Sequence, residues 1–159
     1  MLRSGGLGRA ALGVTLSALS ACAAVDDPPA PVPSMGLDEA VFRCKVQPIL
    51  ARQCSYSACH GLAGSPFRVF SPGKLRATVP ADIDAAIAPL TDAEQHANYL
   101  SATGFKFGAA DPIDNLLLRK PLPPTEGGYA HEGGAIFLGT GDAEWMTMHE
   151  WLAGTGKCP

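Results

Sequence analysis

Between residues 38 and 53 the apolar side chains recur at the spacing of one helical face. The members of this face, at positions i, i+4, i+7 and i+8, are Phe42, Val46, Ile49 and Leu50. This spacing predicts an amphipathic helix with one apolar side. Pro48 removes a backbone donor inside that helix and is expected to kink it or to end it early.

A second helix is predicted from its start and stop signals. Thr91 and Glu94 have the spacing of a capping box, in which the threonine caps the helix and the glutamate bonds back to it. Gly104 supplies the stop. The residues that helical spacing puts on one side of this helix are His96, Tyr99, Leu100 and Thr103.

Two further helices are predicted in the second half of the chain. Asp111 and Pro112 form a start signal, with proline at the first helical position, and this helix ends before Pro121. The last helix lies within residues 142–154 and is closed by Gly154. Its apolar residues, which recur at i, i+3 and i+7, are Trp145, Met148 and Leu152.

The segments between these helices are broken by glycine and proline. Residues 61–90 and 121–139 carry only short apolar runs, so both are predicted to be mainly loop. No convincing strand pair and no internal repeat is evident in the sequence. The pattern therefore predicts an all-α fold, a small helical domain with long loops.

Residues 1–21 have the features of an export signal. Arg3 and Arg9 are followed by an apolar run that is shorter than the ~20 residues a membrane-spanning helix needs. The run ends in "LSAC", which resembles the lipobox of bacterial lipoproteins. This resemblance implies that Cys22 is lipidated and becomes the new N-terminus. The alternative is a soluble secreted protein that is cleaved nearby.

The signal divides the chain into three parts. Residues 1–21 are the lipoprotein signal peptide, residues 22–37 form a proline-rich tether, and residues 38–159 make one domain. The expected location is the cell envelope, where the lipid anchor would make the membrane a partner. No aspartate stands directly after Cys22, where Ala23 and Ala24 follow, and this favours the outer membrane, facing the periplasm or the exterior.

Charge and motif content exclude two classes of function. The chain has 12 basic and 15 acidic residues, a formal net charge of −3, and no cluster of basic residues along the sequence. A nucleic-acid partner would require a clustered basic face, so none is expected. No nucleophile–base pair or acidic dyad stands in a recognisable motif, so we do not expect an enzyme.

The five cysteines leave several pairings open. They are Cys22, Cys44, Cys54, Cys59 and Cys158. Lipidation takes the first, and in an exported protein the other four can form two disulfides in any of three connectivities. Alternatively, Cys54 and Cys59 bind a haem while Cys44 pairs with Cys158. A zinc site of Cys44, Cys54, Cys59 and His60 is a third alternative.

The stretch "CSYSACHG", residues 54–61, suggests a c-type haem attachment site. Such a site usually closes with a cysteine followed directly by histidine, as Cys59 and His60 do here. Four residues separate Cys54 from Cys59, where the usual site has two. The alternative is a disulfide between Cys54 and Cys59 beside an unrelated histidine.

Four segments together resemble a known family. "FRCKVQPILARQCSYSACHG" is similar to the opening segment of the cytochrome c-like domains first defined in planctomycete proteins. "NLLLRKP", "HEGGAIF" and "WMTMHEWLAG" resemble later segments of the same family, so the resemblance covers most of the chain from Phe42 to Gly154. The chain departs from the family pattern in the wider cysteine spacing, in Glu132, and in the extra Cys44 and Cys158.

The resemblance implies a cytochrome c-like domain with one covalent haem c. Cys54 and Cys59 would form its thioethers and His60 would be one axial ligand. In the loop 121–139 there is no methionine, and His131 is the expected sixth ligand. The alternatives are Met146 and Met148 of the last helix, another histidine, or a vacant sixth position.

Two functions follow from these alternatives. The first is an electron-transfer module that is anchored to the cell envelope and exchanges electrons with a redox partner protein. The second is a haem-free, disulfide-stapled envelope lipoprotein that acts as a binding or structural module.

Overall fold

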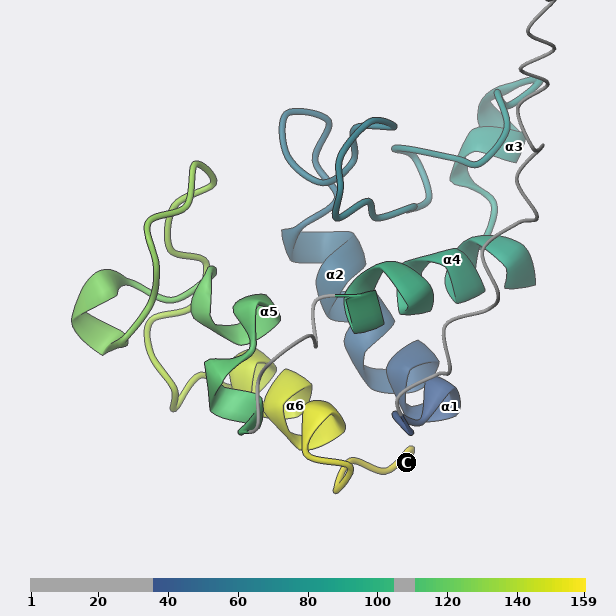
Figure 1. Cartoon of the computed structure of the whole chain (residues 1–159). Coiled ribbons are helices and arrows are strands. Elements are labelled where there is room, and N and C mark those ends of the chain that lie inside the picture. Colours follow the sequence, from purple (N-terminus) through teal and green to yellow (C-terminus); the bar gives the residue numbers. More distant parts are fainter. Residues whose placement is uncertain (1–35, 105–110) are drawn as a thin grey trace, which may run out of the picture. The chain divides into compact units, whose positions relative to one another are not determined.

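The computed structural model describes residues 36–104 and 111–159 (Figure 1). The elements, in chain order, are α1 (Glu39–Val41), η1 (Phe42–Val46), α2 (Gln47–Gln53), α3 (Ile83–Ile87), α4 (Asp92–Thr103), η3 (Pro112–Asp114), α5 (Leu116–Arg119), η4 (Pro124–Glu126) and α6 (Ala143–Leu152). Because α1, η1 and α2 are continuous, the described residues contain five helices, and they contain no strand. The predicted small all-α domain with long loops is confirmed.

The signal peptide, Cys22 and most of the tether lie outside the described residues. Within the described ranges, every helix is too short or too polar to cross a bilayer.

The first helix runs from Glu39 to Gln53, so Pro48 does not end it early. A π-helical turn, η1, comes directly before the proline, and in it the Gln47 N–H donates to the carbonyl of Phe42. In a regular α-helix the proline ring would clash with the carbonyl four residues earlier. The wider π turn accommodates the ring, and the helix continues to Gln53.

Helix α4 has the predicted ends, and its buried residues coincide only in Tyr99 with the side that the spacing groups together. Thr91 and Glu94 form the capping box, and Gly104 follows the last turn. Of the residues that the spacing puts on one side of this helix, Tyr99 is buried, whereas Leu100 is 48% exposed. The residues that α4 does bury are Glu94, Asn98, Tyr99 and Ala102. Two of these four are polar, which is why apolar spacing alone did not find this face.

The burial of Asn98 is tolerated because its side-chain amide makes three hydrogen bonds. It donates to the carbonyl of Phe70 at 2.8 Å and accepts the N–H of Phe70 at 2.7 Å, and it also donates to Gln47 at 2.9 Å. A buried amide is stable when its polar atoms are bonded in this way. Asn98 therefore fixes α4 to both the first helix and the loop around Phe70.

Two other segments differ from the predicted helices. The helix predicted from Asp111 is divided into η3 and α5 by Asn115, whose extended backbone ends the first and whose side chain caps the second. Helix α3 was not predicted, although Asp82 caps it by accepting the N–H of Ala85. It buries no residue, so it carries no apolar periodicity to detect.

The core joins the two ends of the domain. The Phe42 ring lies 5.2 Å from that of Trp151 and 5.7 Å from that of Tyr99, measured between centroids. Trp151 Nε1 also donates to the carbonyl of Asp38 at 2.9 Å. Helices α4 and α6 therefore both pack on η1. Figure 1 shows both of them beside the first helix, of which η1 is the middle part.

A disulfide closes the same junction. Cys44 of η1 is bonded to Cys158, across a sequence separation of 114 residues. This is the pairing expected in the alternative in which Cys54 and Cys59 bind a haem. It also removes Cys44 from the alternative zinc site, because a disulfide sulfur is not a thiolate ligand.

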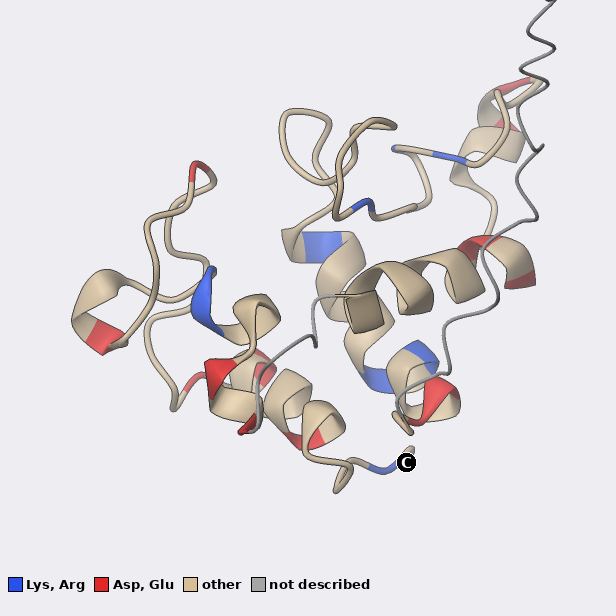
Figure 2. Cartoon of the chain, viewed as in Figure 1, with Lys and Arg blue, Asp and Glu red and all other residues tan. Residues whose placement is uncertain are grey.

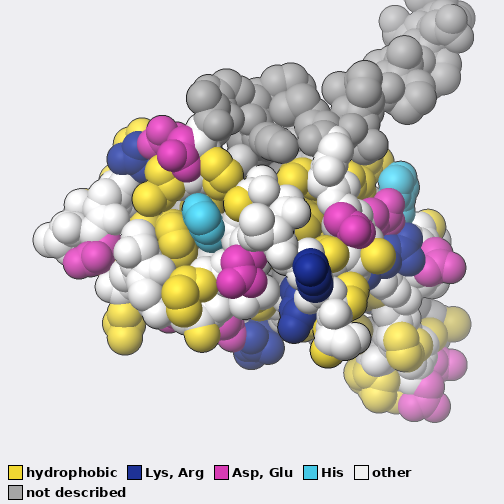
Figure 3. Space-filling view, turned by 90° about the horizontal axis from the view of Figure 1, so that it is seen from below, with side chains coloured by type: hydrophobic (Ala, Val, Ile, Leu, Met, Phe, Trp, Pro, Cys, Tyr) yellow, Lys and Arg dark blue, Asp and Glu magenta, His cyan; other side chains and the backbone are white. Residues whose placement is uncertain are grey.

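Charged groups add local links between these elements. Figure 2 shows basic residues on the first helix and acidic residues on α6, and Arg52 and Glu144 form an ion pair between the two. Gln53 donates to the same carboxylate at 2.9 Å. On the face in Figure 3, charged side chains of both signs are interspersed with hydrophobic ones.

Candidate functional site

A pocket of about 520 Å³ opens between the end of α2 and the second half of the domain. This volume lies within the range of roughly 300–1,000 Å³ that is usual for small-molecule and cofactor sites. Its apolar lining residues are Tyr56, Pro66, Phe67, Leu116, Leu117, Pro121, Ile136, Phe137 and Met148. Its other lining residues are Gln53, Cys54, Cys59, His60, Ser65, Lys120, His131 and Gly133. The two cysteines and two histidines predicted for the site therefore line one pocket.

The loop between the two cysteines is tightly folded. The N–H groups of Cys59 and Gly61 both donate to the carbonyl of Tyr56 at 2.9 Å, and the N–H of His60 donates to the carbonyl of Cys54 at 3.2 Å. Ser55 is fully buried. The four residues between the cysteines thus form a compact turn that brings Cys54 and Cys59 to the same cavity.

Gly61 is required for this turn. A Cβ atom at position 61 would lie 2.2 Å from the carbonyl oxygen of Ser55, a distance at which the backbone would have to move. Lys74 supports the same turn from outside. Its ammonium donates to Ser55 Oγ at 2.9 Å and lies 3.9 Å from the centre of the Tyr56 ring.

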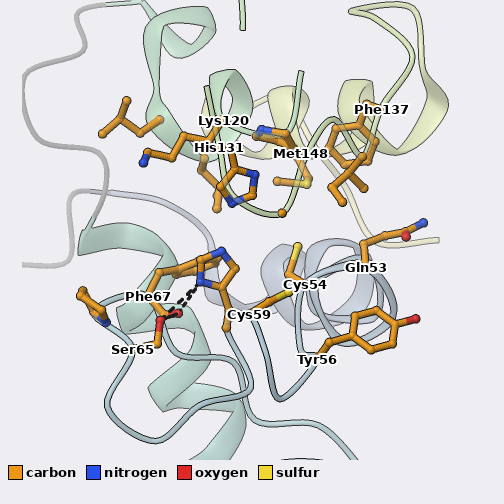
Figure 4. Close-up of a pocket in the computed structure, with 17 residues that line it drawn as sticks. Gln53, Cys54, Tyr56, Cys59, Ser65, Phe67, Lys120, His131, Phe137 and Met148 are labelled. Carbon is orange, nitrogen blue, oxygen red and sulfur yellow. Dashed lines mark hydrogen bonds between the residues drawn. The ribbon is translucent and has the colours of Figure 1, made fainter. Parts of the chain in front are cut away.

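Cys54 and Cys59 are both free thiols. Figure 4 shows their side chains on one side of the pocket, with His131 and Met148 on the other. Burial, together with the nearby Cys59 thiol, raises the pKa of Cys54 to about 12. Cys59 is exposed. The disulfide between these two residues, which was the alternative expectation, is not formed in this structure.

His60 is held in one tautomer. Its Nδ1 lies 2.9 Å from the carbonyl oxygen of Phe67, and because a carbonyl only accepts, Nδ1 carries the hydrogen. The Nε2 lone pair is then free to bind a metal or to accept a hydrogen bond. Burial lowers the pKa of His60, against the opposing effect of the Phe67 carbonyl, and His131 lowers it further. Burial and the nearby His131 thus both favour the neutral form of the His60 ring.

The ring of His131 lies close to that of His60 within the pocket. The two ring centroids are 5.9 Å apart and the ring planes differ by only 10°. His131 Nδ1 lies 3.2 Å from the carbonyl oxygen of Gly134, so this ring also presents Nε2 as its free nitrogen. The two imidazoles come from segments 71 positions apart in the sequence.

The two methionines considered with His131 occupy different environments. Met148 is 1% exposed and lines the pocket, whereas Met146 is 44% exposed and is not among the lining residues. Both lie on α6, two positions apart, which places them on different sides of the helix. Met148 therefore belongs to the site and Met146 does not.

Sequence reasoning missed two contributors to the site. The carbonyl of Phe67 orients His60, and the Phe67 ring packs against it with centroids 4.6 Å apart. Lys120 is the one lysine among the lining residues of the pocket. The Phe67 carbonyl has no sequence signal, because every residue has a carbonyl. Lys120 belongs to the segment "NLLLRKP", but nothing in that segment indicated a role in the site.

The described residues contain no group of three or more His, Cys, Asp and Glu side chains arranged to hold a metal ion. A metal at this site would therefore need further ligands besides the two imidazoles. Comparisons with protein-family models, with curated proteins and with solved structures give no match for this chain.

Proposed function

We propose that this pocket binds one c-type haem covalently and that the domain is an electron-transfer module of the cytochrome c-like type. The observation that carries the proposal is the pair of neighbouring imidazoles, His60 and His131, in an apolar pocket that also contains two free cysteines. The resemblance of four sequence segments to cytochrome c-like domains supports the same assignment.

His60 and His131 would both hold the haem iron. Their ring centroids lie 5.9 Å apart in the pocket, and the ring planes differ by 10°. In His60 and in His131, Nδ1 is bonded to a backbone carbonyl, the outer contact that metal-bound histidines usually make.

The cysteine geometry fits covalent attachment. Cys59 precedes His60 directly, and the turn around Tyr56 brings Cys54 to the same pocket despite the four intervening residues. Thioether formation consumes two thiols, and both are free. The other pair, Cys44 and Cys158, is already bonded, so the four cysteines of the domain would all be used.

Bound haem supplies a one-electron redox couple at its iron. The chain's own residues would set the environment of that couple. His60 and His131 would give an iron with two imidazole ligands, whose potential lies below that of a histidine–methionine site. The apolar side chains of Phe67, Leu117 and Phe137, which line the pocket, would exclude water from the haem ring.

The wider setting is proposed on the sequence alone. Lipidation at Cys22 would anchor the domain to the cell envelope, where it would exchange electrons with a redox partner protein. The disulfide between Cys44 and Cys158 is compatible with an oxidising compartment outside the cytoplasm.

Expression with the c-type haem maturation machinery tests the proposal. The wild-type chain should retain haem after denaturation and give a pyridine haemochrome spectrum. Replacing both Cys54 and Cys59 by Ala should abolish covalent haem. The matched control replaces Cys44 and Cys158 by Ala, which removes two cysteines outside the pocket and should leave the haem attached.

A wild-type chain without covalent haem contradicts the proposal. If its mass also shows a disulfide between Cys54 and Cys59, the haem-free, disulfide-stapled lipoprotein becomes the better account.

A further inference from the structure

Met148 lines the same pocket as His60 and His131. Its side chain is 1% exposed, lines the pocket, and is on the same side as His131, opposite Cys54 and Cys59 (Figure 4). A thioether sulfur is one of the common axial ligands of haem iron. Ordinary core packing explains why Met148 is buried, but the core alone does not require that it share one side of this pocket with His131.

We propose that Met148 is a latent axial ligand, which binds the iron when His131 is withdrawn from the pocket. This inference rests on the proposed haem site. It gives the domain two ligation states, one with two histidines and one with His60 and Met148.

The two candidate ligands are held differently. His131 lies in the loop between η4 and α6, its ring is partly exposed, and its Nδ1 bond to Gly134 lies within the same loop. Met148 lies in the middle of α6, a ten-residue helix whose Trp145 donates to the carbonyl of Leu118 at 3.1 Å. Withdrawal of the loop would remove His131 without moving α6.

The chemistry of methionine suits this role. Its unbranched side chain has three rotatable bonds and a polarisable sulfur, so it can change conformation without movement of the helix backbone. Methionine ligation raises the reduction potential of a haem relative to a second histidine. Exchange of the ligand would therefore switch the module between a lower and a higher potential.

The test is the variant His131→Ala in the haem-loaded full chain. We expect its haem to stay low-spin, its reduction potential to rise, and the charge-transfer band of ferric haem–thioether ligation to appear. Adding Met148→Leu should convert this variant to a high-spin haem without that band. The leucine conserves volume, so the core should tolerate it.

The control is Met146→Leu in the His131→Ala background. Met146 is on the same helix but outside the pocket, so this change should leave the spectrum and the potential of His131→Ala unaltered. A high-spin haem in His131→Ala alone would overturn the inference. A low-spin spectrum that Met148→Leu does not change would also overturn it.

The state of the haem separates this inference from the proposed function. Covalent haem in a high-spin His131→Ala variant rejects the role of Met148 and leaves the haem site intact. The absence of covalent haem from the wild-type chain rejects both.

Discussion

The backbone around Gly61 shows how closely the turn between the two cysteines is packed. The carbonyl oxygen of Ser55 would lie 2.2 Å from a Cβ atom at position 61, and the backbone carbon of Tyr56 would lie 2.9 Å from it. Both neighbours are backbone and cannot rotate away. The position of His60, one residue earlier, therefore depends on a glycine here.

Replacement of Gly61 by Ala is expected to destabilise the domain. Because the backbone must move to relieve the clash, we expect a loss of about 1–3 kcal/mol in the free energy of unfolding, measured by urea titration. The control is Gly64→Ala, since Gly64 lies in the next turn with no atom within 4 Å of the added carbon. Its effect should be within about 1 kcal/mol of zero. Equal effects of the two variants would contradict this account of the turn.

Single residues of the site were predictable to different degrees. Cys59 and His60 are adjacent, so the sequence itself displays their relation. The choice of His131 followed from the absence of methionine in its loop, and the structure brings it to His60 at 5.9 Å between ring centroids. Met148 belongs to an apolar helical pattern that is the same for a core residue and for a pocket wall. Its place in the pocket was therefore visible only in three dimensions.

At the scale of elements, the start of α4 depends on one carboxylate. Glu94 accepts from Arg76 Nε and Nη2, both at 2.9 Å, and from the N–H groups of Ala77 and Thr91. The Arg76 guanidinium, assisted by these N–H groups and against the effect of burial, lowers the pKa of Glu94 to about 2. The ion pair fixes the segment before α3 to the first turn of α4.

This pKa makes the stability of the domain depend on pH. The ordinary pKa of 4.5 applies to the unfolded chain, so between pH 4.5 and 2 the unfolded state binds more protons than the folded state. The contribution of Glu94 is thus fully present above about pH 5 and is lost as the pH falls towards 2. The urea midpoint of the wild type should fall over this range.

The variant Glu94→Gln should be less stable than the wild type at pH 7 and should lose part of this pH dependence. The exposed Glu150→Gln serves as the control, because it removes one carboxylate without touching the ion pair. If the two variants show the same pH profile of urea midpoints, Glu94 is not the group responsible.

Elements were predicted well where local signals decide the structure. The capping box of α4 and the ends of α6 depend on residues within one helical turn, so the sequence displays them. The continuation of the first helix past Pro48 depends on a π turn, and the burial of Asn98 depends on bonds to Phe70 and Gln47. These features arise from tertiary contacts that no local pattern contains.

At the scale of the whole domain, the disulfide between Cys44 and Cys158 joins the first helix to the C-terminal segment. It reinforces the contact that Phe42, Tyr99 and Trp151 make in the core. Parity of the cysteines left this pairing as one alternative among several, because residues 114 positions apart have no local signal. The fold selects one of these pairings because it brings Cys44 of the first helix next to Cys158 of the C-terminal segment.

Removal of this disulfide should destabilise the domain without affecting the pocket. For the double variant Cys44→Ala and Cys158→Ala we expect a loss of about 2–4 kcal/mol in the free energy of unfolding, because the unfolded chain is no longer constrained. The wild type under reducing conditions should have the same urea midpoint as the variant. An unchanged midpoint in the variant would show that the disulfide does not contribute to stability.

The most direct test of the haem site is the mass of one peptide. Cleavage after Arg52 and Arg68 releases residues 53–68, which contain both pocket cysteines and His60. After maturation in a cell that makes c-type haem, denaturation and trypsin digestion, this peptide should carry the mass of one haem, with neither thiol available for alkylation. The same peptide without added mass, with both cysteines alkylated or joined in a disulfide, would contradict the account.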